Sequence, residues 1–269
     1  MKKNFPLEFI YQLFSLLVVF IIVHALFITI IRPTAARQIE AQRVQLAADP
    51  QLQTDDSFYI IVQGYEQETC IILMLWALCI LAYKSVSAYR QNRLLDDDVL
   101  GLPEDMPIGM EDTRALTQQI RDLPGSRQNT LMFRSLLLAI ERFRATGNVQ
   151  DAATTAHDVI ESQGERMESE LSVIRYISWA IPSIGFIGTV RGIGDALGKA
   201  HQAVEGDITG VTESLGLAFN STFIALVLSI ILMFFVHQLQ LSQERLVLDT
   251  EQYVDHWLIR RLRGRPPSV

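Results

Sequence analysis

The apolar residues of this sequence are gathered into long runs, and this segregation limits the fold more than any other feature. The runs Phe9–Ile31 and Leu215–Val236 contain no formally charged residue. As α-helices they would measure about 34 and 33 Å, which is enough to cross the hydrocarbon core of a bilayer. The sequence therefore predicts an all-α integral membrane protein.

Two further runs complete the expected spans. Thr69–Tyr83 reaches only about 22 Å as a helix, so it needs the segment Tyr59–Tyr65 to supply another turn. Val173–Leu197 includes charged and hydroxyl residues, a pattern typical of a helix that packs among other helices. We thus expect four transmembrane helices, the last two extending into a helical cytoplasmic domain. The expected division is transmembrane helices at 1–31, 69–84, 173–197 and 214–238, periplasmic loops at 32–68 and 198–213, a cytoplasmic helical domain at 85–172, and a cytoplasmic C-terminal helix and tail at 239–269.

The composition excludes several other classes of protein. A hydrophobic content of 49% excludes a disordered chain, and a net charge of −7 disfavours a nucleic-acid partner. Cys70 and Cys79 lie in one apolar run on opposite sides of a helix, which excludes a disulfide scaffold. A mean hydropathy of +0.21 together with 20% charged residues fits a membrane protein with a substantial polar portion.

The basic residues predict the orientation of the spans. Of the 23 Lys and Arg residues, 17 lie in the segments 1–8, 84–170 and 239–269. Because basic residues beside a span favour the cytoplasmic side, we expect a multi-pass protein with both termini in the cytoplasm. No small-residue cleavage site follows the first run, and Arg32-Pro33 closes it, so we expect a retained anchor rather than a signal peptide.

The sequence between the second and third runs predicts a connecting elbow and amphipathic helices. Residues 94–110 carry three consecutive aspartates, two prolines and two glycines, a composition typical of a connection. Helices are expected at 111–123 and 129–146. Gly147 fits the position that follows a helix, and Asn148 with Asp151 resembles a capping box.

Both inner spans are expected to continue far beyond the bilayer. No proline interrupts the chain from Val149 to Pro182, and Gly164 is the obvious weak point of a helix there. Leu217–Leu262 contains neither proline nor glycine and would form a rod of about 69 Å.

Small and hydroxyl residues form one stripe on each of the last two spans. With helical spacing, the members are Gly185, Thr189, Gly192 and Ala196 on the third run and Ser214, Ala218, Thr222, Ala225 and Ser229 on the fourth. One interpretation is close helix packing through Gly185, Gly188, Gly192, Ala218 and Ala225. The other is a polar track in which Thr189, Thr222 and Ser221 bond an ion, a water or a carboxyl group of a partner.

The acidic residues are absent from the middle of all four runs. Hydroxyls do not titrate near neutral pH, so a proton-conducting version of this protein requires a carboxylate from another chain. His24 is a candidate relay, but a lone histidine packed against a neighbouring helix is the favoured interpretation because no titratable partner accompanies it in its run.

Asp195 permits an enzymatic hypothesis that the sequence disfavours. Gly192-Ile193-Gly194-Asp195 matches the GxGD string of intramembrane aspartyl proteases, but that chemistry needs a second facing aspartate. A pair with Arg191, four residues earlier on the same helix, is expected instead, near the outer boundary of the membrane. No metal-ligand, phosphate-binding or nucleophile motif is recognised, so we expect no enzyme, no metal and no cofactor.

Three stretches resemble the MotA/TolQ/ExbB proton-channel family. Residues Ile181–Ile193 resemble its AP-x-LGLLGTV-x-GI signature, and Glu165–Glu168 followed by Leu171 resembles the ER-L-E lead-in of ExbB and TolQ. Ala218–Phe223 resembles the threonine-bearing AL-x-x-TF segment of MotA-type stators. The resemblance covers about residues 160–240, and the two spans before the cytoplasmic insert match MotA by topology.

The resemblance implies the pore or stator subunit of an ion-driven rotary motor in a bacterial inner membrane. It implies a homopentamer around a dimeric MotB/ExbD/TolR-like single-span partner, whose membrane aspartate carries the ion past Thr189 and Thr222. It favours protons over sodium ions, and it leaves both flagellar rotation and envelope energisation open as outputs, with a cytoplasmic or envelope effector. The alternative is a non-conducting membrane scaffold.

Overall fold

The structure, a computed structural model, describes residues 7–48, 57–95, 107–204 and 206–263. These residues are helical apart from turns and one isolated bridge between Ile108 and Leu262. Four helical stretches are long and apolar enough to cross a membrane, which confirms the expected number of spans. The chain divides into two compact units: unit 1 is Met1–Ala82 with Val173–Val236, and unit 2 is Tyr83–Ser172 with His237–Val269.

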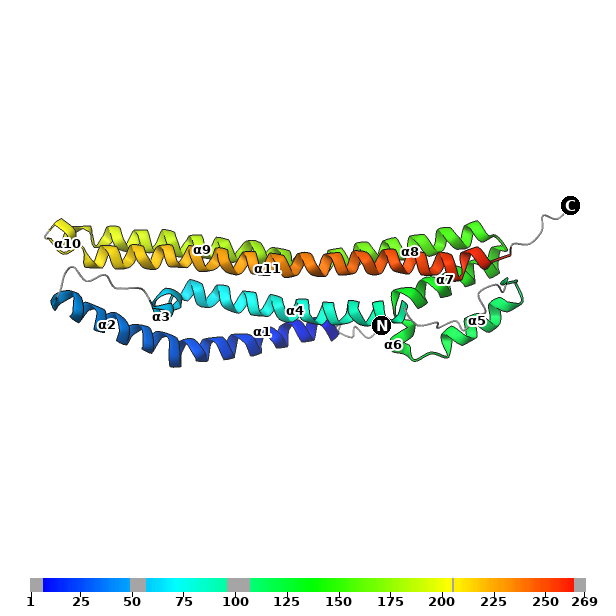
Figure 1. Ribbon diagram of the computed structural model, residues 1–269, viewed down its shortest axis with the longest axis horizontal. Helices are drawn as coiled ribbons and strands as arrows, with labels where there is room; N and C mark the ends of the chain where they lie inside the picture. Colours follow the sequence, from blue (N-terminus) through cyan, green and yellow to red (C-terminus); the bar gives the residue numbers. More distant parts are fainter. Residues whose placement is uncertain (1–6, 49–56, 96–106, 205, 264–269) are drawn as a thin grey trace, which may run out of the picture. The chain divides into compact units, whose positions relative to one another are not determined.

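In unit 1, the first span is longer than the sequence predicts (Figure 1). Helix α1 (Leu7–Leu26) passes through a π-helical turn (Phe27–Ile31) directly into α2 (Arg32–Ala48). Pro33 therefore does not end the helix, contrary to our expectation. Proline lacks an N–H and crowds the carbonyl four residues earlier, and a wider π turn just before it accommodates both effects.

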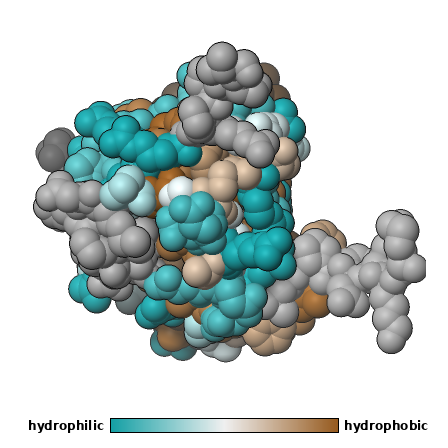
Figure 2. Space-filling view, turned by 90° about the vertical axis from the view of Figure 1, so that its right-hand side faces the viewer, coloured by the Kyte–Doolittle hydropathy of each residue, from teal (hydrophilic) through white to brown (hydrophobic). Residues whose placement is uncertain are grey.

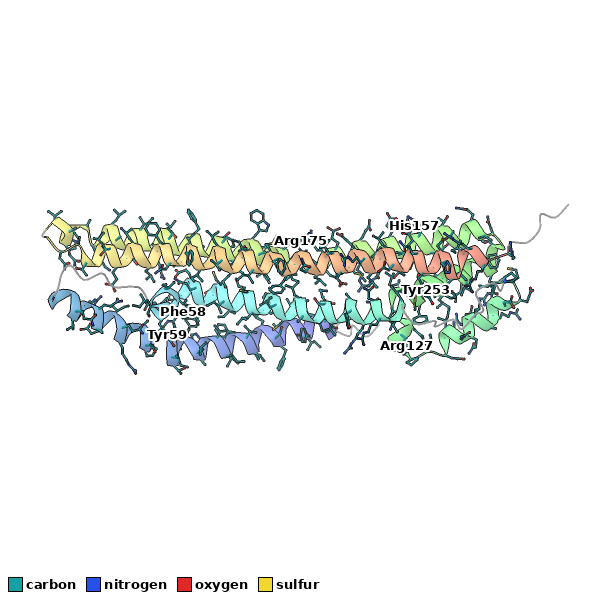
Figure 3. The ribbon with its side chains drawn as sticks, in the orientation of Figure 1. Phe58, Tyr59, Arg127, His157, Arg175 and Tyr253 are labelled. Atoms are coloured by element: carbon teal, nitrogen blue, oxygen red, sulfur yellow. The ribbon has the colours of Figure 1, made fainter. Side chains whose placement is uncertain are left out.

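The second span begins before its apolar run. The short helix α3 (Phe58–Val62) precedes α4 (Tyr65–Leu95), so much of the expected loop 32–68 is helical. The rings of Phe58 and Tyr59 meet edge to face at the start of α3 (Figure 3). Because α4 starts at Tyr65, Glu66 and Glu68 occupy its first turn, where acidic side chains complement the helix dipole.

The third span is preceded by a turn at an unexpected place. Helix α8 (Val149–Ser169) stops before Glu170, and α9 (Ser172–Gly198) begins after Leu171, whereas Gly164 lies inside α8. Glu170 accepts hydrogen bonds from Lys84 and Arg166, at 2.9 and 3.0 Å, which hold this turn. Burial alone would raise the pKa of the Glu170 carboxyl, but these two cations outweigh burial and lower the pKa below its usual range.

The fourth span confirms the expected rod. After the short helix α10 (Ala200–Val204), α11 (Thr209–Trp257) continues for 49 residues, about 74 Å of helix. Its first half belongs to unit 1 and its second half to unit 2.

Unit 2 has its own apolar core. Helices α5 (Asp112–Arg121), α6 (Gly125–Gln128), α7 (Leu131–Thr146) and α8 pack with the end of α11 around Phe133, Leu136, Ile140 and Phe143, all fully buried. Backbone hydrogen bonds from Ile108 to Arg261 and from Arg263 to Ile108 tie the two ends of this unit together. Figure 2 shows a face on which hydrophilic side chains are interspersed with apolar ones. The elbow expected at 94–110 falls largely on 96–106, outside the described residues.

Both expected helix boundaries of unit 2 are present. Gly147 ends α7 with φ of +69°, a left-handed conformation that favours glycine. The Asn148 side chain accepts a hydrogen bond from the Gln150 N–H, 2.9 Å away, at the start of α8. Asp151 accepts from the Asn148 side chain at 3.3 Å, whereas the Asn148 N–H donates to the Thr146 hydroxyl at 3.2 Å, so the reciprocal bond of a capping box is not formed.

Candidate functional site

The small residues of α9 and α11 bring the two helices into backbone contact. A Cβ added to Gly192 would lie 2.6 Å from the Ala218 Cβ and 3.0 Å from the Ser214 carbonyl oxygen. A Cβ on Gly185 would collide with Ala225 in the same way. The stripes therefore face one another, as the packing interpretation requires.

Thr189 and Thr222 meet across this contact. Their hydroxyl oxygens are 2.5 Å apart. Each hydroxyl also reaches a carbonyl of the opposite helix: Thr189 lies 3.0 Å from the Ala218 oxygen, and Thr222 lies 3.0 Å from the Gly185 oxygen. The two threonines singled out from the sequence thus form one polar cluster inside the apolar part of the chain.

This cluster has more hydrogen-bond contacts than protons. Two hydroxyls supply two protons, whereas three short oxygen–oxygen contacts join them to each other and to the two carbonyls. At most two of the contacts are hydrogen-bonded at once, so the donors can exchange between alternative arrangements. Such a cluster can accept a hydrogen bond from water or a carboxyl group, or coordinate an ion. It can do so while it keeps at least one of its internal hydrogen bonds.

Ser221 extends the cluster toward α4. Its hydroxyl donates to the Leu217 carbonyl, 3.1 Å away, and its Cβ would lie 2.7 Å from a Cβ on Gly188. The Glu66 side chain fills the same space, with its Cγ 3.1 Å from that position. Gly188 thus admits both Ser221 and a carboxylate-bearing side chain of the second span.

Glu66 corrects one expectation drawn from the sequence, the pairing of Arg191 with Asp195. It accepts a hydrogen bond from Arg191 at 2.9 Å, and no ion pair joins Arg191 to Asp195 in the described part of the chain. Asp195 is exposed on α9 instead. The chain also places a carboxylate beside its hydroxyl stripes, although Glu66 lies outside every apolar run of the sequence. In the sequence, Glu66 is recognisable only as an acidic residue in the first turn of a helix, a position that complements the helix dipole.

His24 is also not alone. Its Nδ1 is 2.6 Å from one carboxylate oxygen of Glu68, and the guanidinium of Arg32 donates to the other oxygen. The favoured interpretation of a lone histidine is therefore wrong, because the partner comes from α4, 44 residues away along the chain.

The remaining stripe residues also bond between helices. Ser229 donates to the Ser178 carbonyl at 3.2 Å, and Lys199 donates to the Ser214 hydroxyl at 2.9 Å. Ala196, Ala218 and Ala225 are buried. Every member of the two stripes thus lies at or next to the contact between α9 and α11.

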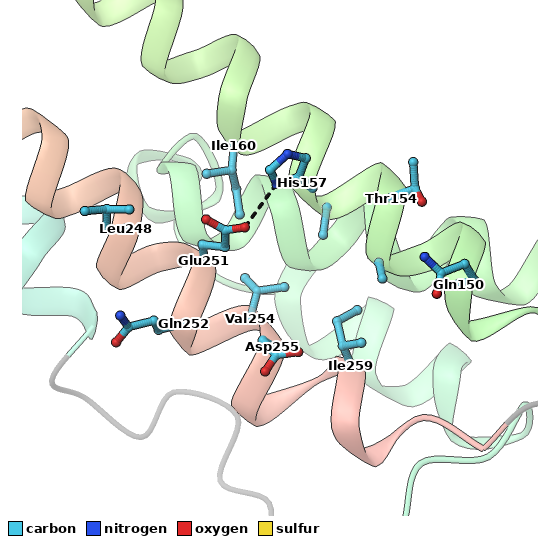
Figure 4. A pocket seen from close by; sticks show the side chains of 12 residues that line it. Gln150, Thr154, His157, Ile160, Leu248, Glu251, Gln252, Val254, Asp255 and Ile259 are labelled. Carbon is cyan, nitrogen blue, oxygen red and sulfur yellow. Dashed lines mark hydrogen bonds and ion pairs between the residues drawn. The ribbon is translucent and has the colours of Figure 1, made fainter.

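Pockets lie away from this contact in both units. In unit 1, one of about 270 Å³ lies between α2, α3 and α11, and Arg43 and Glu213 form an ion pair of 2.8 Å in its lining. In unit 2, one of about 620 Å³ lies between α8 and α11, where His157 and Glu251 are 3.0 Å apart (Figure 4). Within the described ranges, no group of His, Cys, Asp and Glu side chains is arranged to hold a metal ion.

The fold and this contact define a multi-pass membrane protein whose two long helices share a threonine cluster. Residues 128–252 match the model of the MotA/TolQ/ExbB proton channel family, which confirms the resemblance inferred from the sequence. The match includes α7, α8, α9 and most of α11, while α1 and α4 lie outside it. No curated protein and no solved structure matches the chain.

Proposed function

We propose that this protein is the pore subunit of an ion-motive-force-driven membrane motor, with the proton as the favoured ion. The observation that carries the proposal is the Thr189–Thr222 cluster, which lies within the stretch that matches a proton channel family. The cluster offers exchangeable donors and acceptors between two of the long apolar helices.

The ion needs a titratable carrier, because hydroxyls do not titrate near neutral pH. The family resemblance supports a pentameric ring around a dimeric single-span partner that brings an aspartate to the threonines. Thr189, Thr222 and Ser221 would then bond the carboxyl group as it gains and loses its proton. Movement of the partner relative to the ring would convert ion flow into mechanical work.

A bacterial inner membrane with both termini in the cytoplasm is part of this proposal. The basic residues beside the second span and at the C-terminus support that orientation. Unit 2 would then lie in the cytoplasm and offer the surface on which an effector is driven.

The test replaces one hydroxyl by a methyl group. Thr222→Val keeps the shape of the side chain but removes the hydroxyl that contacts the Gly185 carbonyl and Thr189. We expect the complex of chain and partner to assemble normally and its proton flux in liposomes to fall at least tenfold. Thr222→Ser is the matched control, because it keeps the hydroxyl, and it should retain most of the flux.

The competing function is a non-conducting scaffold in which the cluster only packs helices. Interhelical hydrogen bonds in membranes contribute about 0.6 kcal/mol each on average, so the scaffold predicts slight destabilisation and no other effect of Thr222→Val. Full flux in a correctly assembled Thr222→Val complex would reject the assigned role of the cluster. Purification without any single-span partner would favour the scaffold.

A further inference from the structure

A second polar site lies between the first two spans, around Glu68. His24 and Arg32 are on either side of the π-helical turn Phe27–Ile31, and both bond the Glu68 carboxylate of α4. π-helical turns inside α-helices frequently mark functional sites. Here the turn adjusts the helix so that two side chains eight positions apart reach one carboxylate.

The hydrogen bonds of Glu68 determine which nitrogen of His24 carries a proton. Arg32 donates to one oxygen, so the carboxylate acts as an acceptor in this site. The 2.6 Å contact of the other oxygen with His24 Nδ1 then requires the proton on Nδ1. In neutral His24, Nε2 is therefore the nitrogen with a lone pair.

Within this chain, the inner side of the imidazole is covered and the outer side is not. The Glu68 side chain is 7% exposed, whereas that of His24 is 44% exposed. Phe20 stacks on the imidazole with centroids 5.5 Å apart, and the Tyr65 ring lies 4.1 Å from the Arg32 guanidinium. No described residue hydrogen-bonds to Nε2.

We propose that His24 is a proton-binding site of this chain. A proton adds to the Nε2 lone pair and gives an imidazolium, while the Nδ1–H bond to Glu68 stays in place; release reverses the step. The charged groups that face the imidazole are Glu68 from α4 and, behind it, Arg32 from α2. Glu66, two residues before Glu68 on α4, pairs with Arg191 instead of His24.

This site supplies what the threonine cluster lacks, which is a basic nitrogen that can bind a proton. It belongs to the part of the chain outside the family match. The inference therefore does not depend on the proposed motor function, and it is tested on the purified chain without a partner.

The test is ¹⁵N solid-state NMR of the full-length protein in lipid bilayers, with all five histidines labelled. His24→Gln identifies the His24 signals by their loss. We expect neutral His24 to carry its proton on Nδ1, and we expect acidification to protonate Nε2 while Nδ1 remains protonated. A neutral tautomer with the proton on Nε2 would overturn the proposal, as would a His24 that stays neutral while the other four histidines become charged.

Two variants on one helix separate the proposed site from general effects on packing. Glu68→Gln removes the acceptor charge, so the preference for the Nδ1–H tautomer should be lost. Glu66→Gln, two residues earlier on α4, breaks the pair with Arg191 and should leave the His24 spectrum unchanged. Equal effects of both variants would reject the role of Glu68. If Glu68→Gln does not fold, the wild-type spectrum still decides between the outcomes above.

Discussion

At the scale of single residues, the absence of a side chain at Gly192 shapes the site as much as the threonines do. The Ala218 Cβ and Cα and the Ser214 carbonyl all lie within 3.0 Å of the position that a Cβ would take. Two of these three atoms belong to the backbone of α11 and cannot rotate away. The hydroxyls of Thr189 and Thr222 reach opposite carbonyls because the helices approach this closely.

Gly192→Ala should therefore force α9 and α11 apart and destabilise the protein. We expect a loss of about 1–3 kcal/mol, typical of overpacking a tight contact. The measurement is the free energy of unfolding, or the apparent Tm, of the purified chain in detergent.

The chain offers a matched control and a partial rescue for this variant. Gly194 is on the same helix, and a Cβ there would meet nothing within 4 Å. Gly194→Ala should leave stability unchanged or raise it by up to about 1 kcal/mol through helix propensity. Ala218→Gly in the Gly192→Ala background removes the nearest atom and should restore part of the loss; equal loss in Gly192→Ala and Gly194→Ala would contradict the close contact.

The two residue-level sites differ in how far the sequence predicted them. The Thr189–Thr222 pairing follows from two stripes with helical spacing, a local pattern. The partners of His24 and Arg191 do not follow from any local pattern, because Glu68 and Glu66 are 44 and 125 residues away along the chain. Such pairs depend on which helices pack against each other. The local pattern of a single sequence does not indicate that packing.

At the scale of elements, the boundaries with local chemical causes were predictable and the others were not. Gly147 and Asn148 end α7 and begin α8 where expected, since each acts through its own backbone or its nearest neighbours. The turn at Glu170 depends on Lys84, 86 residues earlier, so the local sequence does not predict it. The continuation of the first helix through Pro33 was not predicted for a different reason: a π turn offsets the usual effect of proline.

Gly147→Ala tests the boundary between α7 and α8. The left-handed φ of +69° costs a residue with a Cβ about 1–2 kcal/mol, so unit 2 should lose that much stability. Gly125→Ala is the control, because a Cβ there would meet nothing within 4 Å, and its effect should stay within about 0.5 kcal/mol. Chemical denaturation followed by circular dichroism compares the two, and an unchanged midpoint in Gly147→Ala would show that the turn relaxes without strain.

At the scale of the whole molecule, the number of spans sets a topological constraint. If all four candidate spans cross the membrane, the chain returns to the side from which it started, and we therefore predict that the N-terminus, the connection between the second and third spans, and the C-terminus share one side. The connection between α9 and α11 must then lie on the other side. From the distribution of basic residues we predict that the shared side is the cytoplasm.

Cysteine labelling tests this arrangement with one residue from each side. His201 on α10 and Arg127 on α6 are both exposed, and each is replaced by cysteine in a chain whose Cys70 and Cys79 are changed to serine. A membrane-impermeant maleimide should label His201→Cys in intact spheroplasts, whereas Arg127→Cys should react only after the membrane is opened. The reverse pattern would invert the orientation. Labelling of both residues from outside would contradict the four-span arrangement, because in that arrangement one complete crossing, that of α9, separates α6 from α10.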